Sequence, residues 1–405
     1  MLFSTSNPFS LKLPLKLVDT KTQYQSLYTA FDVFPSAKGA GTHIHHFANT
    51  LLKAYPQGLL YVLGDEKLPE TEIWDNGVNV WRYKSLNPNF LERTEGYSQG
   101  LLRWLAWQEN LKLCHFRDIW GGVPILLNPN RNYKTIFEVN ALPSVELPYR
   151  YSVSNKILDE IKRLENFCLQ NCDQIVVPSA VIAHFLEKKG IAGRKIQIIT
   201  NGAELPETTI ERPADAPEKY IIYFGALQPW QGVDTLLRAF RLLQDTDLYL
   251  VICSSHKARY GKAYHKFAEK LGIAEKIVWK YQLSKQELYA WVKYAYCSLA
   301  PLKECSRNLE QGCSPLKILE AMALATPVIA SDMSVCREII SSEQVGRLIR
   351  PDRPAELARA IRIWLAYPER VKEIGYNAQK HIARQFDWLA KKQELKNLYL
   401  RLLSN

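Results

Sequence analysis

The chain has 405 residues, which is more than one hydrophobic core usually holds, so two domains are expected. Hydrophobic residues make up 47% and charged residues 23%, and this balance excludes disorder on a large scale. No apolar run reaches the roughly 18 residues of a membrane span. The first apolar stretch is broken by Lys12, Pro14 and Lys16, which argues against a signal peptide. We therefore expect a cytoplasmic protein.

The net charge of +11 is unevenly distributed along the chain. Residues 251–300 hold nine Lys or Arg against three Asp or Glu, and residues 351–405 hold eleven against six. A basic surface favours anionic partners such as nucleotide diphosphates, lipid head groups or nucleic acid. The alternative is a solvated face without any partner. Of these, we expect a nucleotide diphosphate and a peripheral contact with an anionic membrane, and no nucleic acid.

The eight cysteines include no Cys-x-x-Cys pair, so neither a zinc ribbon nor a thioredoxin-like motif is present. Scattered thiols are typical of a reducing cytoplasm. Cys305 and Cys313 flank one loop, and a redox pair is the alternative to two reduced thiols there.

The first part of the chain alternates between strand-like and helix-like segments. A strand over Leu27–Phe34 runs into a glycine-containing turn, and a helix follows with Ile44, Phe47 and Leu51 on one face. Later helices are expected at Lys156–Asn171 and Val181–Lys189. The remaining strands are expected at Leu59–Leu63, Leu111–Phe116, Thr135–Val139, Gln174–Pro178 and Lys195–Thr200.

A proline-containing segment, Asn201–Lys219, has no clear periodicity and is predicted to link the two domains. A second series starts at the strand Tyr220–Gly225 and continues with a helix at Val233–Leu243. Its other strands are expected at Leu248–Cys253, Lys276–Trp279, Cys297–Ala300 and Pro327–Ala330. This alternation predicts parallel sheets covered on both faces. The last stretch, Trp388–Leu403, is predicted to be an amphipathic helix.

The segment from Gln311 to Ser331 carries the strongest local signal. Ser314 suits a helix N-cap and Pro315 suits the first helical position. Such a helix directs free amides and its positive dipole end toward the carboxyl edge of the sheet, where parallel-sheet proteins bind ligands. Lys317 then lies where a phosphate favours a cation, and Glu320 has the chemistry to accept hydrogen bonds from vicinal hydroxyls. The alternative is a capped helix with an incidental Lys317–Glu320 pair.

These segments together resemble the retaining, nucleotide-sugar-dependent glycosyltransferases of family four, which have the GT-B fold of two Rossmann-like domains. The resemblance covers nearly the whole length. The segments that carry it are Lys38–His43, Ile136–Ser144, Cys172–Ser179, Ile199–Gly202, Tyr223–Asp234 and Ser314–Asp332. It implies an N-terminal acceptor domain over 1–203, a C-terminal donor domain over 204–387, and a final helix over 388–405 that packs back toward the N-terminal domain.

The resemblance also assigns a donor site. Its residues are Gly39, Gly41, Gly225, Gln231, Ser314, Pro315, Leu316 and Glu320. The chain departs from the family pattern at several positions. Gly312 stands where the first of two glutamates is usual, Ala226 and Gln231 replace an arginine and a lysine that hold the diphosphate, and Glu138 replaces a histidine. We expect Arg307 and Lys317 to neutralise phosphate instead, and Glu138 to line the reaction centre.

Three other groups have open interpretations. His115, Arg117 and Asp118 follow the predicted fourth strand, where lining an acceptor cleft and a structural role are both consistent with the sequence. His43, His45 and His46 invite a metal, but no carboxylate or cysteine has ligand spacing, and these residues begin a helix. Trp104 and Trp107 suggest a membrane-surface anchor, whereas their spacing with Leu101 and Leu105 favours a core face.

The resemblance therefore implies a metal-independent, retaining glycosyltransferase without a resident cofactor. Its donor is expected to be a UDP- or GDP-linked sugar, and its acceptor a glycan, a lipid-linked glycan or a small molecule, as in polysaccharide biosynthesis. Two alternatives are a sugar-nucleotide-binding GT-B protein that has lost catalysis and a GT-B enzyme of another chemistry, such as an epimerase. A phosphorylase would need a committed lysine in a different pattern.

Overall fold

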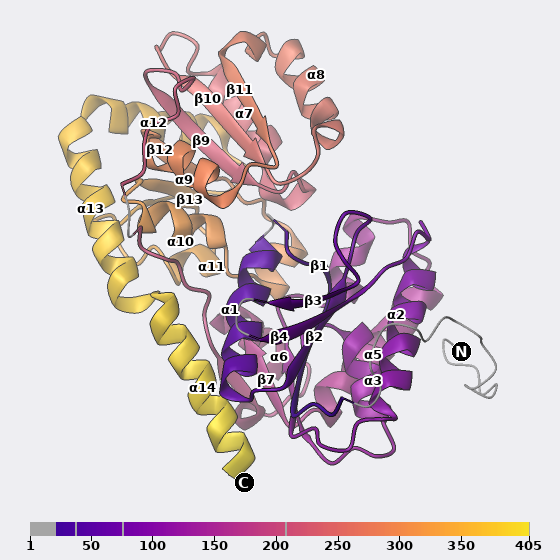
Figure 1. Ribbon diagram of the computed structural model, residues 1–405. Coiled ribbons are helices and arrows are strands. Elements are labelled where there is room, and N and C mark those ends of the chain that lie inside the picture. The colour runs from indigo at the N-terminus through magenta and orange to yellow at the C-terminus, as the bar shows by residue number, and fades with distance from the viewer. Residues whose placement is uncertain (1–21, 37–38, 75–76, 207–208, 405) are drawn as a thin grey trace.

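The fold was determined as a computed structural model that describes residues 22–36, 39–74, 77–206 and 209–404. Lys38 of the predicted glycine loop and the broken apolar stretch at the N-terminus lie outside these residues. Two α/β domains follow each other along the chain, each built on its own sheet (Figure 1). The expected class, two doubly wound parallel-sheet domains, is confirmed.

The N-terminal sheet has the strand order β3-β4-β2-β1-β5-β6-β7-β8. All its neighbouring strands pair in parallel except β3 and β4, which pair antiparallel. The strands span Ser26–Val33 (β1), Gly58–Leu63 (β2), Thr71–Trp74 (β3), Val78–Tyr83 (β4), Leu113–Phe116 (β5), Lys134–Glu138 (β6), Gln174–Val177 (β7) and Ile196–Ile198 (β8).

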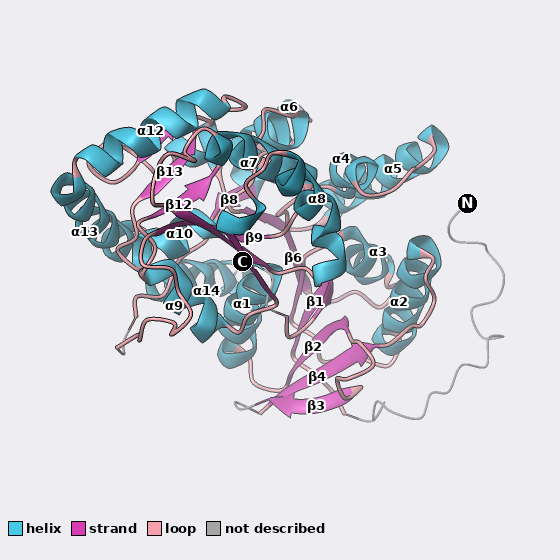
Figure 2. Cartoon of the chain, turned by 90° about the horizontal axis from the view of Figure 1, so that it is seen from above, coloured by secondary structure: helices cyan, strands magenta, loops and turns pink. Residues whose placement is uncertain are grey.

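Helices cover both faces of this sheet because its central strands are apolar on both sides. Figure 2 shows them on either side of β1 and β2. One face packs against helices α1 and α14, and the other against α2, α3, α5 and α6. The helices of this domain are Gly39–Ala54 (α1), Phe90–Leu105 (α2), Ile119–Leu127 (α3), Pro143–Glu146 (α4), Asn155–Asn171 (α5) and Ala180–Lys188 (α6).

The C-terminal sheet is parallel throughout, in the order β11-β10-β9-β12-β13-β14. Its strands are Tyr220–Gly225 (β9), Tyr249–Ser254 (β10), Ile277–Tyr281 (β11), Cys297–Ala300 (β12), Val328–Ser331 (β13) and Arg347–Ile349 (β14). Its helices are Val233–Arg241 (α7), Lys262–Lys270 (α8), Lys285–Lys293 (α9), Leu316–Ala323 (α10), Ser334–Arg337 (α11), Pro354–Ala366 (α12) and Pro368–Gln385 (α13). A π-helical turn, Arg307–Gln311, precedes α10.

The chain passes between the domains twice at one place. Ala203, near the start of the predicted linker, forms a bridge with Asp387, and its amide donates to the carbonyl of Phe386 at 2.8 Å. Helix α14, Trp388–Ser404, then runs along the N-terminal domain beside α1 (Figure 1). Its Tyr399 hydroxyl lies 2.9 Å from Nδ1 of His115, so the last helix belongs to the core of the first domain.

The hairpin of β3 and β4 was not predicted. Side chains of β3 are exposed on both faces, and Ile73 is 72% exposed, so this strand has no alternation of buried and exposed residues. In the structure the strand Leu113–Phe116 is the fifth along the chain, not the fourth. Strand β14 and helices α12 and α13 were also missing from the predicted elements.

Candidate active site

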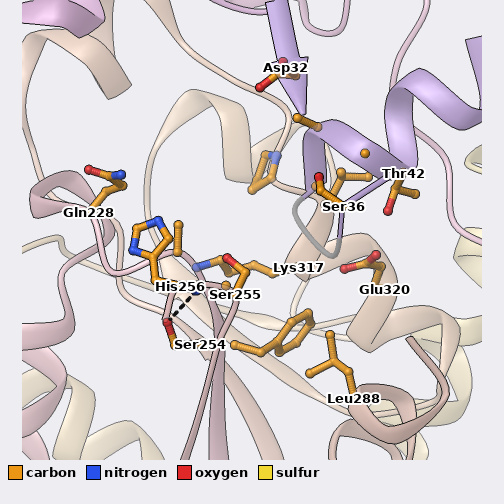
Figure 3. Close-up of a pocket in the computed structure, with 18 of the residues that line it drawn as sticks. Asp32, Ser36, Thr42, Gln228, Ser254, Ser255, His256, Leu288, Lys317 and Glu320 are labelled. Carbon is orange, nitrogen blue, oxygen red and sulfur yellow. Dashed lines mark hydrogen bonds between the residues drawn. The ribbon is translucent and has the colours of Figure 1, made fainter. Parts of the chain in front are cut away.

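A cavity of about 600 Å³ lies between the domains. It opens where β1 of the first sheet and β9 and β10 of the second end, beside the first turns of α1 and α10 (Figure 3). Most of the predicted site residues are brought together here. Those that line the cavity are Gly39, Gly41, Gly225, Gln231, Arg307, Ser314, Pro315, Leu316, Lys317 and Glu320.

The two helix starts approach each other across the domain boundary. A Cβ at Gly39 would lie 3.0 Å from Cδ1 of Leu316, so any side chain there would press on the start of α10. At Gly41, a Cβ would meet the carbonyl oxygen of Ser36 at 2.2 Å, a distance that requires glycine. These two glycines let the chain of the first domain come close to the α10 amides.

Helix α10 starts one residue later than the sequence predicts. Pro315 is the N-cap and Leu316 the first helical residue, and no side chain caps this end. The expectation that Ser314 caps the helix is wrong, because Pro315 takes the N-cap position and no side chain bonds to the first amides. The carbonyl of Ser314 accepts from Nδ2 of Asn201 at 3.0 Å. The amides of Leu316 and Lys317 have no hydrogen-bond acceptor among the described residues. An uncapped helix end facing a cavity suits an anion.

Lys317 is held beside these amides. Its Nζ donates to Oε1 of Gln231 at 2.6 Å and lies 4.1 Å from the ring centre of Tyr223. The side chain is 9% exposed, and burial lowers its pKa to about 7. The structure contains no Lys317–Glu320 ion pair. Lys317 thus places its ammonium against the side chain of Gln231 in the cavity wall.

Glu320 lies one turn further along α10 and faces the same cavity (Figure 3). Loss of hydration raises its pKa to about 7; Lys285 opposes this effect and Glu204 adds to it. The carboxyl and the ammonium thus exchange protons with solvent in the same pH range. Both groups are strongly perturbed, which is common in ligand sites.

This gives a pH dependence for donor binding. Lys317 is charged below its pKa of about 7, so the affinity for UDP-glucose or GDP-mannose should fall as pH rises from 7 to 9, by at most about tenfold per pH unit. Titration calorimetry across this range measures it. A Lys317→Arg variant should lose the dependence because arginine stays charged. If Glu320→Gln abolishes the pH dependence instead, the titrating group is Glu320.

Arg307 reaches the cavity but already has partners. Its Nε and Nη2 lie 3.1 and 3.0 Å from Oε1 of Glu146 in the first domain, and its guanidinium lies 5.2 Å from the ring centre of Trp230. Glu146 and Trp230 line the cavity as well. Arg307 therefore joins the two domains at the rim, and binding a phosphate would require it to exchange Glu146 for the ligand.

The expectation that Glu138 lines the reaction centre is wrong. Its side chain is 1% exposed and does not reach the cavity. It accepts hydrogen bonds from the hydroxyl of Tyr28 at 2.7 Å and from Nε of Arg117 at 2.9 Å. His43 Nδ1 lies 3.1 Å and His115 Nε2 3.3 Å from its oxygens. Although burial opposes ionisation, His43, His115 and Arg117 hold the pKa of Glu138 well below its usual range.

The remaining candidate residues of the sequence lie outside the cavity or lack the expected partners. His115 and Arg117 belong to this buried network, and Asp118 caps α3, so none of the three lines the cavity. Within the described ranges, no three His, Cys, Asp or Glu side chains gather as metal ligands.

Trp104 is 3% exposed and packs against Tyr24, whereas Trp107 is 61% exposed, so the two cannot act together as an anchor. No helix in the described chain is long and apolar enough to cross a membrane.

Several cavity residues were missed. Asp32 near the end of β1 and Ser254, Ser255 and His256 at the end of β10 line the cavity. The sequence offered a signal for them: Asp32 lies near the end of one predicted strand and the other three directly follow another, at the edge where parallel sheets bind ligands.

Comparison with known proteins matches both halves of the chain. Residues 37–206 match the family model described as Glycosyltransferase Family 4, and residues 207–381 match the one described as Glycosyl transferases group 1. The chain belongs to the group 1 glycosyltransferase family. The GT-B fold expected from the resemblance is thereby confirmed.

A relative of known activity and solved structures of the same fold are similar to this chain. A D-inositol 3-phosphate glycosyltransferase of Corynebacterium glutamicum is 27% identical over 53% of this chain and 51% of its own length. The match spans about half of that relative. A sucrose-phosphate synthase structure from Thermosynechococcus elongatus superposes with a TM-score of 0.78 at 18% identity, covering 94% of this chain and all of the other. The structure of the Anabaena protein HepE with UDP-glucose superposes with a TM-score of 0.73 at 16% identity, covering 93% of this chain and 99% of the other.

Proposed function

We propose that this protein is a glycosyltransferase that moves a sugar from a nucleotide donor to a hydroxyl-bearing acceptor. The observation that carries the proposal is the convergence of an uncapped helix start, the lysine Lys317 and the carboxyl of Glu320 on one cavity between two parallel sheets. The family supports a nucleotide sugar as donor. The binding of UDP-glucose by the similarly folded HepE favours a UDP-linked sugar within the predicted UDP or GDP choice.

In the proposed reaction the second domain binds the donor and the first binds the acceptor. The amides of Leu316 and Lys317 and the ammonium of Lys317 would take the charge that develops on the leaving diphosphate. Such donors are already in place before the bond breaks, so they stabilise the transition state without reorganisation. Glu320 would orient the donor by accepting hydrogen bonds from its hydroxyls. Retention of the anomeric configuration is the outcome that the family resemblance implies.

The altered family positions bear on the alternatives. Gly312 has φ 82°, and a Cβ there would lie 2.7 Å from Val181 of the first domain. A glutamate at this position would force the domains apart, so its absence follows from how they pack. The positions of Ala226 and Gln231 lie in the cavity beside Lys317, which offers a substitute charge. These contacts favour an active enzyme over a binding protein that has lost catalysis.

The test begins with binding and ends with products. A thermal-shift screen of UDP- and GDP-sugars should reveal a donor, since a ligand of the native state raises its stability. Release of nucleotide in the presence of acceptor mixtures then tests transfer. Donor binding without any turnover would favour the inactive alternative, and a free epimerised sugar nucleotide would favour an epimerase.

Turnover is expected to persist without divalent ions. The reason is that helix amides and Lys317 supply the positive charge that a metal supplies elsewhere. The measurement is the initial rate of nucleotide release in excess EDTA, and it should stay within about twofold of the untreated rate. A rate that disappears with EDTA and returns with Mn²⁺ would contradict this prediction.

The membrane contact and the cytoplasmic location stay predictions. The exposed basic residues of α8 and the exposed Trp107 are the surface features that support a contact with anionic lipid.

A further inference from the structure

The first domain contributes one carboxylate to the cavity that is held in a fixed position. Asp32 lies near the end of β1, lines the cavity and is 41% exposed (Figure 3). Nη1 of Arg117 donates to its Oδ2 at 2.6 Å. Its other oxygen, Oδ1, has no hydrogen-bond partner within the described part of the chain. The cavity thus receives a hydrogen-bond acceptor that Arg117 holds in one orientation.

Arg117 is fixed from behind. Its Nε donates to Glu138 at 2.9 Å, and Glu138 is locked in the core by Tyr28, as described above. The guanidinium is 12% exposed and shared by two carboxylates. Its charge is therefore balanced by these carboxylates. To bind an anionic ligand in the cavity, Arg117 would have to leave the buried network, which is unfavourable.

The second carboxylate on this wall is already engaged. Glu146 is paired with Arg307 at 3.0 Å and with Arg150 at 3.3 Å, and Arg150 also lies over Trp230 at 5.7 Å. Phe34 and Trp74 line the cavity and contact each other edge to face at 5.1 Å. Carboxylates accept hydrogen bonds from hydroxyl pairs, and aromatic rings pack against the C–H faces of sugar rings. A phosphate placed against Asp32 would meet a like charge.

We propose that the acceptor is an uncharged, hydroxyl-rich carbohydrate and that Asp32 selects it by binding its hydroxyls. This inference rests on the proposed function and names the acceptor class for the same cavity. Arg117 and Glu138 act as positioning residues that hold the Asp32 carboxylate in place.

The experiment measures binding to the full-length protein, with and without saturating UDP. The probes are a panel of neutral mono- and disaccharides and the corresponding sugar monophosphates. We expect neutral sugars to bind more tightly than their phosphates, and Asp32→Asn to weaken the best neutral probe by about tenfold or more. The affinity for UDP should stay within twofold in this variant, because UDP is assigned to the other domain.

Asp159→Asn is the matched control, since Asp159 is 62% exposed on α5 and pairs only with Lys162. Asp32→Asn should keep its fold because Arg117 retains Glu138, and thermal unfolding checks this. The inference is overturned if no neutral sugar binds, if the phosphates bind as well or better, or if Asp32→Asn binds like wild type. Failure of the wild type to bind UDP- and GDP-sugars would instead contradict the proposed function.

Discussion

Lys317→Ala is expected to lower kcat/KM by roughly a hundredfold or more, equivalent to about 2–4 kcal/mol of transition-state stabilisation. The reason is the position of its ammonium, 2.6 Å from Gln231 and beside the free amides of α10, where a diphosphate would lie. The measurement is steady-state turnover with the donor found by the thermal-shift screen. Lys317→Arg should restore part of the rate because it returns a charge.

The control for this variant is Lys372→Ala, because Lys372 is 75% exposed on α13 and pairs only with Glu369. Folding is not expected to suffer in Lys317→Ala. The lowered pKa of Lys317 means that burial disfavours its charged form, so removing the lysine should leave the melting temperature unchanged or raise it. A variant that is well folded and within a few-fold of wild-type kcat/KM would refute the role of Lys317.

Arg307 was expected to bind the phosphate together with Lys317. Its ion pair with Glu146 allows phosphate binding to be distinguished from a role in joining the two domains. If Arg307 only joins the domains, Glu146→Gln should reproduce the effect of Arg307→Ala. If it binds phosphate, Arg307→Ala should lose about a hundredfold in kcat/KM, whereas Glu146→Gln should retain activity.

Glu138→Gln should lower the free energy of unfolding by about 3–5 kcal/mol, because it removes one partner from a buried charge network. The network joins Arg117, His43, His115 and Tyr28 around one carboxylate that is 1% exposed. Since Glu138 does not reach the cavity, kcat at saturating acceptor should stay within a few-fold of wild type. Chemical denaturation and turnover of the same preparation distinguish these effects.

The pH dependence of stability adds an independent check. The pKa of Glu138 lies well below its usual range, so its contribution is present above about pH 4.3 and is lost as pH falls further. The Gln variant should lack this acid-dependent loss. Glu369→Gln, at an 82% exposed position on α13, should match wild type in both measurements. A large fall in kcat with unchanged stability would return Glu138 to the catalytic centre.

The sequence alone determined where most strands lie along the chain. It also determined the two-sheet architecture and the segment that carries Lys317 and Glu320. These features depend on local apolar runs and on glycine, proline and charge at strand ends, which neighbouring residues encode. Strand β3 was missed because it has no buried face, whereas its partner β4 buries Val78 and Val80.

Only the tertiary structure decided which polar residues meet. Glu138 and Arg117 are 21 positions apart and Asp32 is 85 from Arg117, yet the guanidinium of Arg117 binds both carboxylates. Glu138, which was expected in the cavity, therefore supports Asp32, which lies in it. Tyr399, from the last helix, packs against the same network through His115. Likewise, Asn201 donates to the carbonyl of Ser314, 113 positions away, just before the uncapped start of α10. Such contacts depend on how whole elements pack across large separations, and no local pattern of residues specifies them.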